Sequence, residues 1–198
     1  MDPKDQAGGP RRKADGTPWR IAVIGAECTG KSSLCEALAG RLPAVWVPEA
    51  LREFCDRQGR TPRPDEQAGL VAEQIAREAA ALQTARSRAC AWLVIDSSPL
   101  ATALYSLELF ADTSLLPAAI AHQRHYDLTL LAGIDVPWSA DGIQRDGPDA
   151  RASFHARLTG VLGQAGLAHT ELRGPLPQRL DRALRAAQAV AQERPPSV

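Results

Sequence analysis

Glycine, lysine and serine stand near the beginning of the chain in an arrangement that suits a polyphosphate. Gly25 is followed, after four residues, by Gly30, Lys31 and Ser32. Glycines let the backbone turn its N–H groups inward around an anion, where side chains would obstruct the turn. The lysine can reach the β- and γ-phosphates, and the serine hydroxyl can bind magnesium. The segment therefore predicts a P-loop for ATP and Mg²⁺ that consists of Gly25, Glu27, Cys28, Thr29, Gly30, Lys31, Ser32 and Ser33.

Lys31 is the informative cation of this loop, because the chain uses arginine almost everywhere else. The other lysines, Lys4 and Lys13, stand in a polar stretch that precedes the first apolar segment. An ammonium group on a flexible stem fits a tight phosphate loop where a planar guanidinium does not. Lys31 is accordingly a candidate catalytic residue. A glycine turn between a strand and a helix, without a ligand, is the alternative interpretation.

Two carboxylates directly follow apolar runs that are typical of buried strands. Glu49 follows residues 44–48, and Asp96 follows residues 91–95. Ligands of open α/β sheets bind at the carboxyl ends of the strands. Asp96 is therefore a candidate magnesium ligand, and either carboxylate is a candidate to accept a proton from an acceptor hydroxyl or to hold the acceptor. The alternative is that each carboxylate caps the helix that follows it.

A polar loop at residues 135–151 resembles a lid over a phosphate site. It contains glycine, proline and aspartate, and it carries Arg145 and Arg151. A loop of this kind can close over the phosphates and exclude water, and both arginines are candidate catalytic cations for the charge of the transition state. A solvated loop with surface arginines is the alternative, because arginine is common throughout the chain.

Positioning these residues requires a parallel sheet with helices on both faces. Apolar runs predict strands at 19–25, 44–48, 91–95, 127–132 and 167–172. Helical patterns alternate with them at 31–40, 50–58, 65–88, 99–110, 114–125, 151–164 and from about 177. The alternation predicts an α/β protein of the P-loop NTPase fold, with five parallel strands, helices on both faces and a lid loop. Residues 1–18 are expected to be a disordered tail before a domain at 19–198.

The long helix that begins near residue 65 has its own expected details. Asp65 is a plausible N-cap, since a short acidic side chain can accept hydrogen bonds from the first free N–H groups of a helix. Apolar residues then recur at helical spacing and predict the buried stripe of Ala68, Val71, Ile75, Ala79 and Leu82.

The composition narrows the range of partners and compartments. The 23 basic and 23 acidic residues cancel, so no global field recruits nucleic acid or an anionic membrane. No apolar run approaches the roughly 18 residues that a membrane span needs, and residues 1–18 lack the apolar core of a secretory signal. The four cysteines lack zinc-ligand spacing and are typical of reduced thiols. We expect a cytoplasmic protein, with homo-oligomerisation possible.

The length and the absent motifs favour one class of P-loop protein. The chain lacks the Asn-Lys-x-Asp sequence that reads guanine, which argues against a GTPase. Its 198 residues leave little room for the additional helical domain of a large AAA-type motor. A small-molecule kinase fits both the size and the layout.

One further motif connects the chain to a known family. The run Pro137-Trp138-x-x-Asp141-Gly142 after the fourth strand, together with the P-loop and Asp96, resembles the ribosylnicotinamide kinase domain of the NadR type over about residues 19–190. The resemblance implies transfer of the ATP γ-phosphate to the 5′-hydroxyl of nicotinamide riboside or a similar nucleoside, giving nicotinamide mononucleotide. It also implies that Trp138 stacks on a base or on the nicotinamide ring. The candidate substrate-binding residues are then Glu49, Arg52, Asp96, Trp138 and Asp141.

A second hypothesis belongs to another class of protein. A nucleotide-sensing regulatory ATPase would bind ATP without any nucleoside acceptor. Residues 50–54 motivate this hypothesis, because they lack the aromatic-Gly-Arg pattern expected beside a riboside. The two hypotheses share the P-loop and differ in the acceptor.

Overall fold

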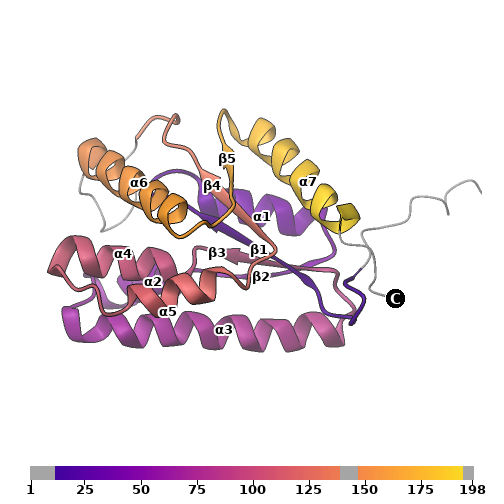
Figure 1. Cartoon of the computed structure of the whole chain (residues 1–198), viewed down its shortest axis with the longest axis horizontal. Coiled ribbons are helices and arrows are strands. Elements are labelled where there is room, and N and C mark those ends of the chain that lie inside the picture. The colour runs from indigo at the N-terminus through magenta and orange to yellow at the C-terminus, as the bar shows by residue number, and fades with distance from the viewer. Residues whose placement is uncertain (1–11, 139–146, 194–198) are drawn as a thin grey trace, which may run out of the picture.

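A five-stranded parallel sheet forms the centre of the structure, a computed structural model that describes residues 12–138 and 147–193 (Figure 1). The strands lie in the order β2-β3-β1-β4-β5, and neighbouring strands are parallel. Their bounds are β1 Trp19–Ile24, β2 Ala44–Val47, β3 Trp92–Asp96, β4 Leu128–Ala132 and β5 Thr170–Leu172. The predicted α/β fold with five parallel strands is confirmed.

Helices cover both faces of the sheet, as the alternating pattern predicted (Figure 1). On one face, α1 and α7 pack against Ile21, Val23 and Leu130. On the other face, α4, α5 and α6 pack against Ala22, Ile24 and other side chains of the central strands. The helices are α1 Lys31–Arg41, α2 Ala50–Gln58, α3 Gln67–Ser87, α4 Pro99–Phe110, α5 Leu116–Gln123, α6 Gly147–Gln164 and α7 Leu176–Glu193.

The central strands are apolar on both sides because both of their faces are buried. In β1, Ile21 to Ile24 are fully buried, and the strand lies between β3 and β4. Near the carboxyl end of the sheet, Val23 pairs with Asp96 on one side and with Leu130 on the other. The loop after β1 and the carboxylate that ends β3 therefore emerge beside each other.

The long helix α3 begins later than the sequence suggested. Asp65 was expected to cap it, but Asp65 lies inside a 3₁₀ turn, Pro64–Glu66, and α3 begins at Gln67. The Glu66 carboxylate stabilises this turn, since it accepts the Arg63 N–H at 2.7 Å and also pairs with the guanidinium of Arg60 at 2.7 Å. A proline at the first position of the turn fits this arrangement, because the turn does not need its N–H.

The buried face of α3 is more polar than the predicted apolar stripe. Ile75 is 37% exposed, whereas Gln67, Gln74 and Glu78 are buried. The Glu78 carboxylate accepts a hydrogen bond from the Tyr126 hydroxyl at 2.8 Å. Polar side chains are tolerated on this face because they have partners on other elements.

Gln74 connects α3 to the beginning of α2. Its Oε1 accepts the buried N–H of Ala50 at 2.9 Å, and Ala50 is the first residue of α2. The first N–H groups of a helix have no partner within the helix, so this side chain from α3 provides one. Glu49, the residue before α2, is held in place by the same contact.

Residues 12–18, which were predicted to belong to the tail, contact the domain in the structure. The Arg12 guanidinium donates to the carbonyl oxygen of Ala85 at 2.8 Å, near the end of α3. The Lys13 ammonium pairs with the Asp127 carboxylate at 2.7 Å. The rest of the predicted tail, residues 1–11, lies outside the described residues.

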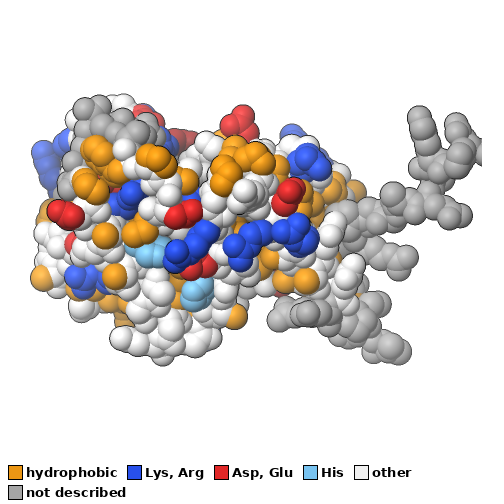
Figure 2. All heavy atoms as spheres, turned by 90° about the horizontal axis from the view of Figure 1, so that it is seen from above, with side chains coloured by type: hydrophobic (Ala, Val, Ile, Leu, Met, Phe, Trp, Pro, Cys, Tyr) orange, Lys and Arg blue, Asp and Glu red, His pale blue; other side chains and the backbone are white. Residues whose placement is uncertain are grey.

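The surface has a mixed character on the face seen in Figure 2, where basic, acidic and apolar side chains are interspersed. This agrees with the balanced formal charge of the chain. Among the helices in residues 12–138 and 147–193, none combines the length and the apolar character needed to cross a bilayer.

Replacing Gln74 by Met is expected to lower the free energy of unfolding by about 1–3 kcal/mol, because the buried Ala50 N–H loses its acceptor. Urea denaturation followed by circular dichroism measures the difference. Gln83, exposed on the same helix, is the matched control, and Gln83→Met should change stability by less than about 0.5 kcal/mol. Equal effects of the two substitutions would contradict the role of Gln74.

Candidate functional site

The loop between β1 and α1 has the backbone geometry that the glycine spacing predicted. A Cβ atom added to Gly25 would lie 3.0 Å from the carbonyl oxygen and 3.1 Å from the Cβ of Ala132 in β4, so only glycine fits there without a shift. Gly30, just before α1, has φ of 76° and lies in the left-handed region. The first glycine therefore allows a close approach to β4, and the second allows a left-handed backbone before α1.

Two side chains stabilise the interior of this loop. The Thr29 hydroxyl donates to the carbonyl oxygen of Ala26 at 2.8 Å, and the Lys31 ammonium donates to the same oxygen at 2.9 Å. Helix α1 begins at Lys31, and within the described structure no side chain caps it. Its first N–H groups and its positive dipole end are therefore available to an anion.

Three depressions surround the loop. A phosphate-sized groove is lined by the loop itself and by one side chain from α2: Cys28, Thr29, Gly30, Lys31, Ser32, Ser33 and Arg52. A second pocket of about 350 Å³ lies beside it, against Val136, Leu176 and Arg179. A third of about 180 Å³ is lined by Glu27, Tyr105, Glu108, Leu109, Ala150, Arg151 and Phe154.

Asp96 is buried at the end of β3, with 2% of its surface exposed. Burial raises its pKa to about 6, and the nearby carboxylate of Glu49 acts in the same direction. A hydrogen bond with Ser32 and the positive charge of Lys31 oppose this rise. The structure thus brings together four predicted site residues from three segments: Lys31, Ser32, Glu49 and Asp96.

Neither carboxylate acts as the helix cap that the alternative interpretation assigned to it. Helix α4 begins at Pro99 with Ser98 as its N-cap, so Asp96 lies too early to cap it. Glu49 is the N-cap residue of α2, but in the described structure its side chain makes no capping hydrogen bond. Both side chains remain available for other contacts.

The oxygen atoms near Ser32 suit a magnesium ion. The Asp96 Oδ1 atom is buried and has no hydrogen-bond partner among the described residues, while Ser32 bonds to the same carboxylate. Magnesium prefers oxygen ligands, and it is usually held by one or two protein groups together with substrate phosphates. The described residues contain no cluster of three or more His, Cys, Asp or Glu side chains that could hold a metal by themselves.

The structure describes only part of the predicted lid. Asp141 and Arg145 fall in residues 139–146, outside the described part of the chain. Trp138 is half-buried at the edge of that segment. Arg151 was expected to be a lid cation or a surface arginine, but it lies on α6 and is 7% exposed.

The contacts of Arg151 explain its burial. Its Nη1 donates to the carbonyl oxygen of Val136 at 3.1 Å. Its Nε has no partner among the described residues, and the side chain lines the pocket that Tyr105 and Phe154 form. These two rings stack with their centroids 4.2 Å apart. Arg151 therefore contributes a buried positive charge to the wall of a pocket that also has aromatic side chains.

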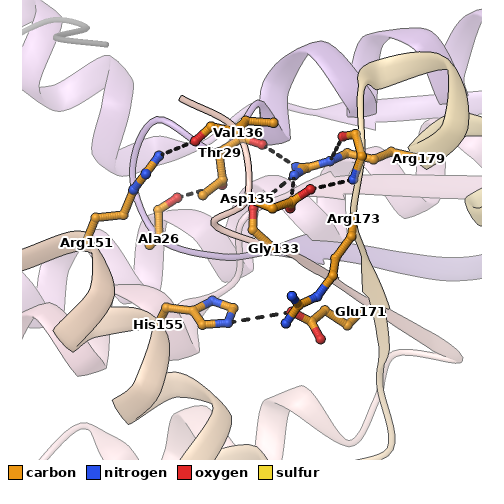
Figure 3. A network of polar contacts seen from close by, with 11 residues as sticks. Ala26, Thr29, Gly133, Asp135, Val136, Arg151, His155, Glu171, Arg173 and Arg179 are labelled. Atoms are coloured by element: carbon orange, nitrogen blue, oxygen red, sulfur yellow. Dashed lines mark hydrogen bonds and ion pairs between the residues drawn. The ribbon is translucent and has the colours of Figure 1, made fainter. Parts of the chain in front are cut away.

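Arg179 is a site residue that the sequence reasoning missed. Its guanidinium is buried between the phosphate loop and the ends of β4 and β5, and it donates to the carbonyl oxygen of Thr29 at 2.7 Å (Figure 3). A signal for its burial is present in the sequence, because Arg179, Ala183 and Ala187 recur every four residues along α7. This spacing places the arginine on the same face as two fully buried alanines.

A parallel sheet, a glycine-bounded loop between a central strand and a helix, and a lysine and a hydroxyl at the start of that helix define a P-loop nucleotide-binding protein. The chain belongs to the family described as AAA domain, whose profile matches residues 20–179. A search of curated proteins found no match to the sequence.

Solved structures of similar fold include two of the NadR protein. The chain is 22% identical to NadR in complex with NR, with a TM-score of 0.67, and the match covers 89% of this chain and 52% of the other. The match to NadR in complex with NAD and AMP-PNP has 19% identity, a TM-score of 0.71 and coverage of 92% and 52%. The chain thus spans about half the length of these relatives.

A thymidylate kinase from Ehrlichia chaffeensis has the same fold over its whole length. It is 11% identical, with a TM-score of 0.62, and the match covers 87% of this chain and 100% of that chain. At these identities the structural matches establish the fold alone, a P-loop fold of the kind found in small-molecule kinases.

Replacing Asp96 by Asn is expected to stabilise the metal-free protein at about pH 8. The folded-state pKa of about 6 exceeds the ordinary value of 3.8, so the folded chain binds more protons between these values. The free energy of unfolding therefore falls as the pH rises through this window. A rise of about 2 pKa units corresponds to at most about 3 kcal/mol, which asparagine avoids. Urea unfolding in the presence of EDTA measures the gain.

The same comparison near pH 4 provides the control, since Asp96 is then protonated in the folded protein and the gain should shrink. A gain that does not depend on pH would contradict the buried, ionised carboxylate as its cause.

Proposed function

We propose that this protein is an ATP-dependent kinase that transfers the γ-phosphate to the 5′-hydroxyl of nicotinamide riboside or a similar nucleoside. The observation that carries the proposal is the buried Asp96, which bonds to Ser32 beside the phosphate loop and has the charge of Glu49 nearby. A protein that only holds a nucleotide does not need two carboxylates at this place. Phosphoryl transfer to a hydroxyl needs one group to organise the magnesium and another to receive a proton.

The two carboxylates divide these tasks in our proposal. Ser32 and Asp96 would hold Mg²⁺, which would neutralise charge on the β- and γ-phosphates. Glu49 is the more accessible of the two and takes the proton of the acceptor hydroxyl. The negative charge of Glu49 contributes to the raised pKa of Asp96, so a cation bound beside Asp96 would favour its ionised form.

The phosphates of ATP are bound by the loop and its lysine. Backbone N–H groups from the loop and from the first turn of α1 surround the β-phosphate, while Lys31 follows the charge of the γ-phosphate into the transition state. Arg52 lines the same groove and adds a second positive charge. The backbone N–H groups are fixed before the reaction, so they need little reorganisation during the transfer.

The aromatic pocket is the proposed acceptor site. Glu27 belongs both to the phosphate loop and to the wall of this pocket, so the two sites adjoin. Tyr105 and Phe154 give this pocket an aromatic wall, and Arg151 adds a positive charge to its lining. The similar structure of NadR in complex with NR supports a nucleoside acceptor of the nicotinamide riboside type.

Incubation of the protein with ATP, Mg²⁺ and a panel of nucleosides that includes nicotinamide riboside should yield a 5′-monophosphate, detected by chromatography. Lys31→Ala is expected to lower kcat by about 10³-fold or more, because the transition-state charge loses its cation. Arg41→Ala removes an exposed charge from the other end of α1 and should leave kcat unchanged.

A protein that binds ATP but shows no turnover across the panel would refute the kinase and favour the nucleotide-sensing ATPase. A thermal-shift screen with a non-hydrolysable ATP analogue separates these outcomes, since only a kinase should gain further stability from a nucleoside.

Replacing Arg151 by Met is expected to raise KM for the acceptor by about 10-fold, because the lining of the pocket loses its guanidinium, a loss worth roughly 1–2 kcal/mol. The dissociation constant for MgATP should not change. Steady-state kinetics and calorimetry measure the two quantities, and Arg157→Met, at an exposed position of the same helix, is the control. Equal losses of ATP and acceptor affinity would place Arg151 outside the acceptor site.

A further inference from the structure

The Arg179 side chain joins three loops at the carboxyl edge of the sheet (Figure 3). Its Nη1 donates to the Thr29 carbonyl oxygen in the phosphate loop at 2.7 Å. Its Nη2 donates to the Gly133 carbonyl oxygen at 3.0 Å and to Asp135 Oδ1 at 2.8 Å, both after β4. Its Nε donates to the carbonyl oxygen of Gly174, after β5, at 2.7 Å.

The acceptors of this guanidinium are themselves fixed. Asp135 Oδ2 accepts the N–H of Gly174 at 2.6 Å, so the carboxylate holds the loop after β5 while its other oxygen pairs with Arg179. A Cβ atom added to Gly133 would lie 2.9 Å from Asp135 Oδ1. The close approach of these backbone segments leaves the arginine one arrangement, in which its buried charge is balanced by Asp135.

The hydrogen bond to the Thr29 carbonyl oxygen also fixes the direction of the Gly30 N–H. The peptide bond between Thr29 and Gly30 is trans, and in a trans peptide the C=O and the N–H point in opposite directions. When Arg179 holds the Thr29 carbonyl, the Gly30 N–H faces away from Arg179. Gly30 lines both the groove of Lys31 and Ser32 and the neighbouring pocket that Arg179 lines, so the Thr29–Gly30 peptide lies at the border between them.

We infer that Arg179 is a positioning residue that turns the Gly30 N–H of the phosphate loop toward the polyphosphate of the nucleotide. The inference rests on the nucleotide-binding half of the proposed function and is independent of the acceptor. Arg179 does not touch the phosphates, and it acts through the orientation of one peptide group. A guanidinium is suited to this task because its donors lie in one rigid plane and can hold four acceptors together.

The alternative is that Arg179 only attaches α7 to the sheet. A structural bond of that kind would lower the stability of the nucleotide-free protein but would not distinguish between ligands. A positioning role predicts instead that affinity is lost for every ligand that places phosphates in the loop, whether or not the ligand carries a base.

The test uses Arg179→Lys, which keeps the positive charge and removes the planar fork. Calorimetry measures the affinities for MgATP and for magnesium tripolyphosphate, which has phosphates but no base. Both affinities are expected to fall by about 10-fold or more and by the same factor, as expected when a charge-assisted hydrogen bond is lost. Arg182→Lys, at an exposed position of the same helix, should change neither affinity.

Unchanged affinities, or a loss for MgATP that tripolyphosphate does not share, would overturn the inference. If Arg179→Lys does not fold, Asp135→Asn replaces it; this variant removes the counter-charge that orients the guanidinium and should show a smaller loss that both ligands share. Failure of the unaltered protein to bind MgATP would refute the proposed function itself, a result distinct from any difference between variants.

Discussion

The unpaired N–H groups at the start of α1 are the constraint on which the rest of the site depends. They converge because the chain leaves a buried central strand and enters a helix within a few residues, through a loop in which a side chain at Gly25 would crowd Ala132 and Gly30 has a left-handed backbone. A converging set of N–H groups favours an anion, and in the proposed kinase the transferred phosphoryl group would also need cations and a metal at its other end. The positions of Lys31, Ser32 and Asp96 follow from that requirement.

Asp96 shows that the site is arranged for chemistry at the expense of stability. A carboxylate that is buried beside a second carboxylate is unfavourable in its ionised form, and its raised pKa expresses that cost. A folded chain selected for stability alone would place an apolar or amide side chain at the end of β3. Strain and unfavourable charge are common at sites where a bound ligand compensates them. In the proposed function, a divalent cation beside Ser32 would compensate the charge of Asp96.

Much of the fold and part of the site could be predicted because their signals are local. The P-loop is complete within Gly25–Ser33, and the central strands are uninterrupted apolar runs, so neither depends on distant partners. The features that were missed depend on contacts far apart in sequence. Arg179 reaches Thr29 across 150 positions. Gln74 is buried only because α2 presents the Ala50 N–H to it, which is why the apolar stripe predicted for α3 was displaced. Arg151 was predicted as a lid cation, but its burial against the Val136 carbonyl likewise depends on a contact outside its own helix.

The contacts of two buried arginines indicate why the phosphate loop contains a lysine, although arginine is the common cation of this chain. Arg151 holds the Val136 carbonyl from α6, and Arg179 holds the Gly133 carbonyl from α7, so guanidinium groups fix the two ends of the segment that follows β4. Each uses a planar fork to bind backbone oxygen atoms that do not move. A γ-phosphate, in contrast, moves during transfer, and a compact ammonium on a flexible stem can move with it. The arginines and Lys31 therefore have different roles because their side chains differ in geometry. Exchanging arginine and lysine at either kind of position should impair the role of that position.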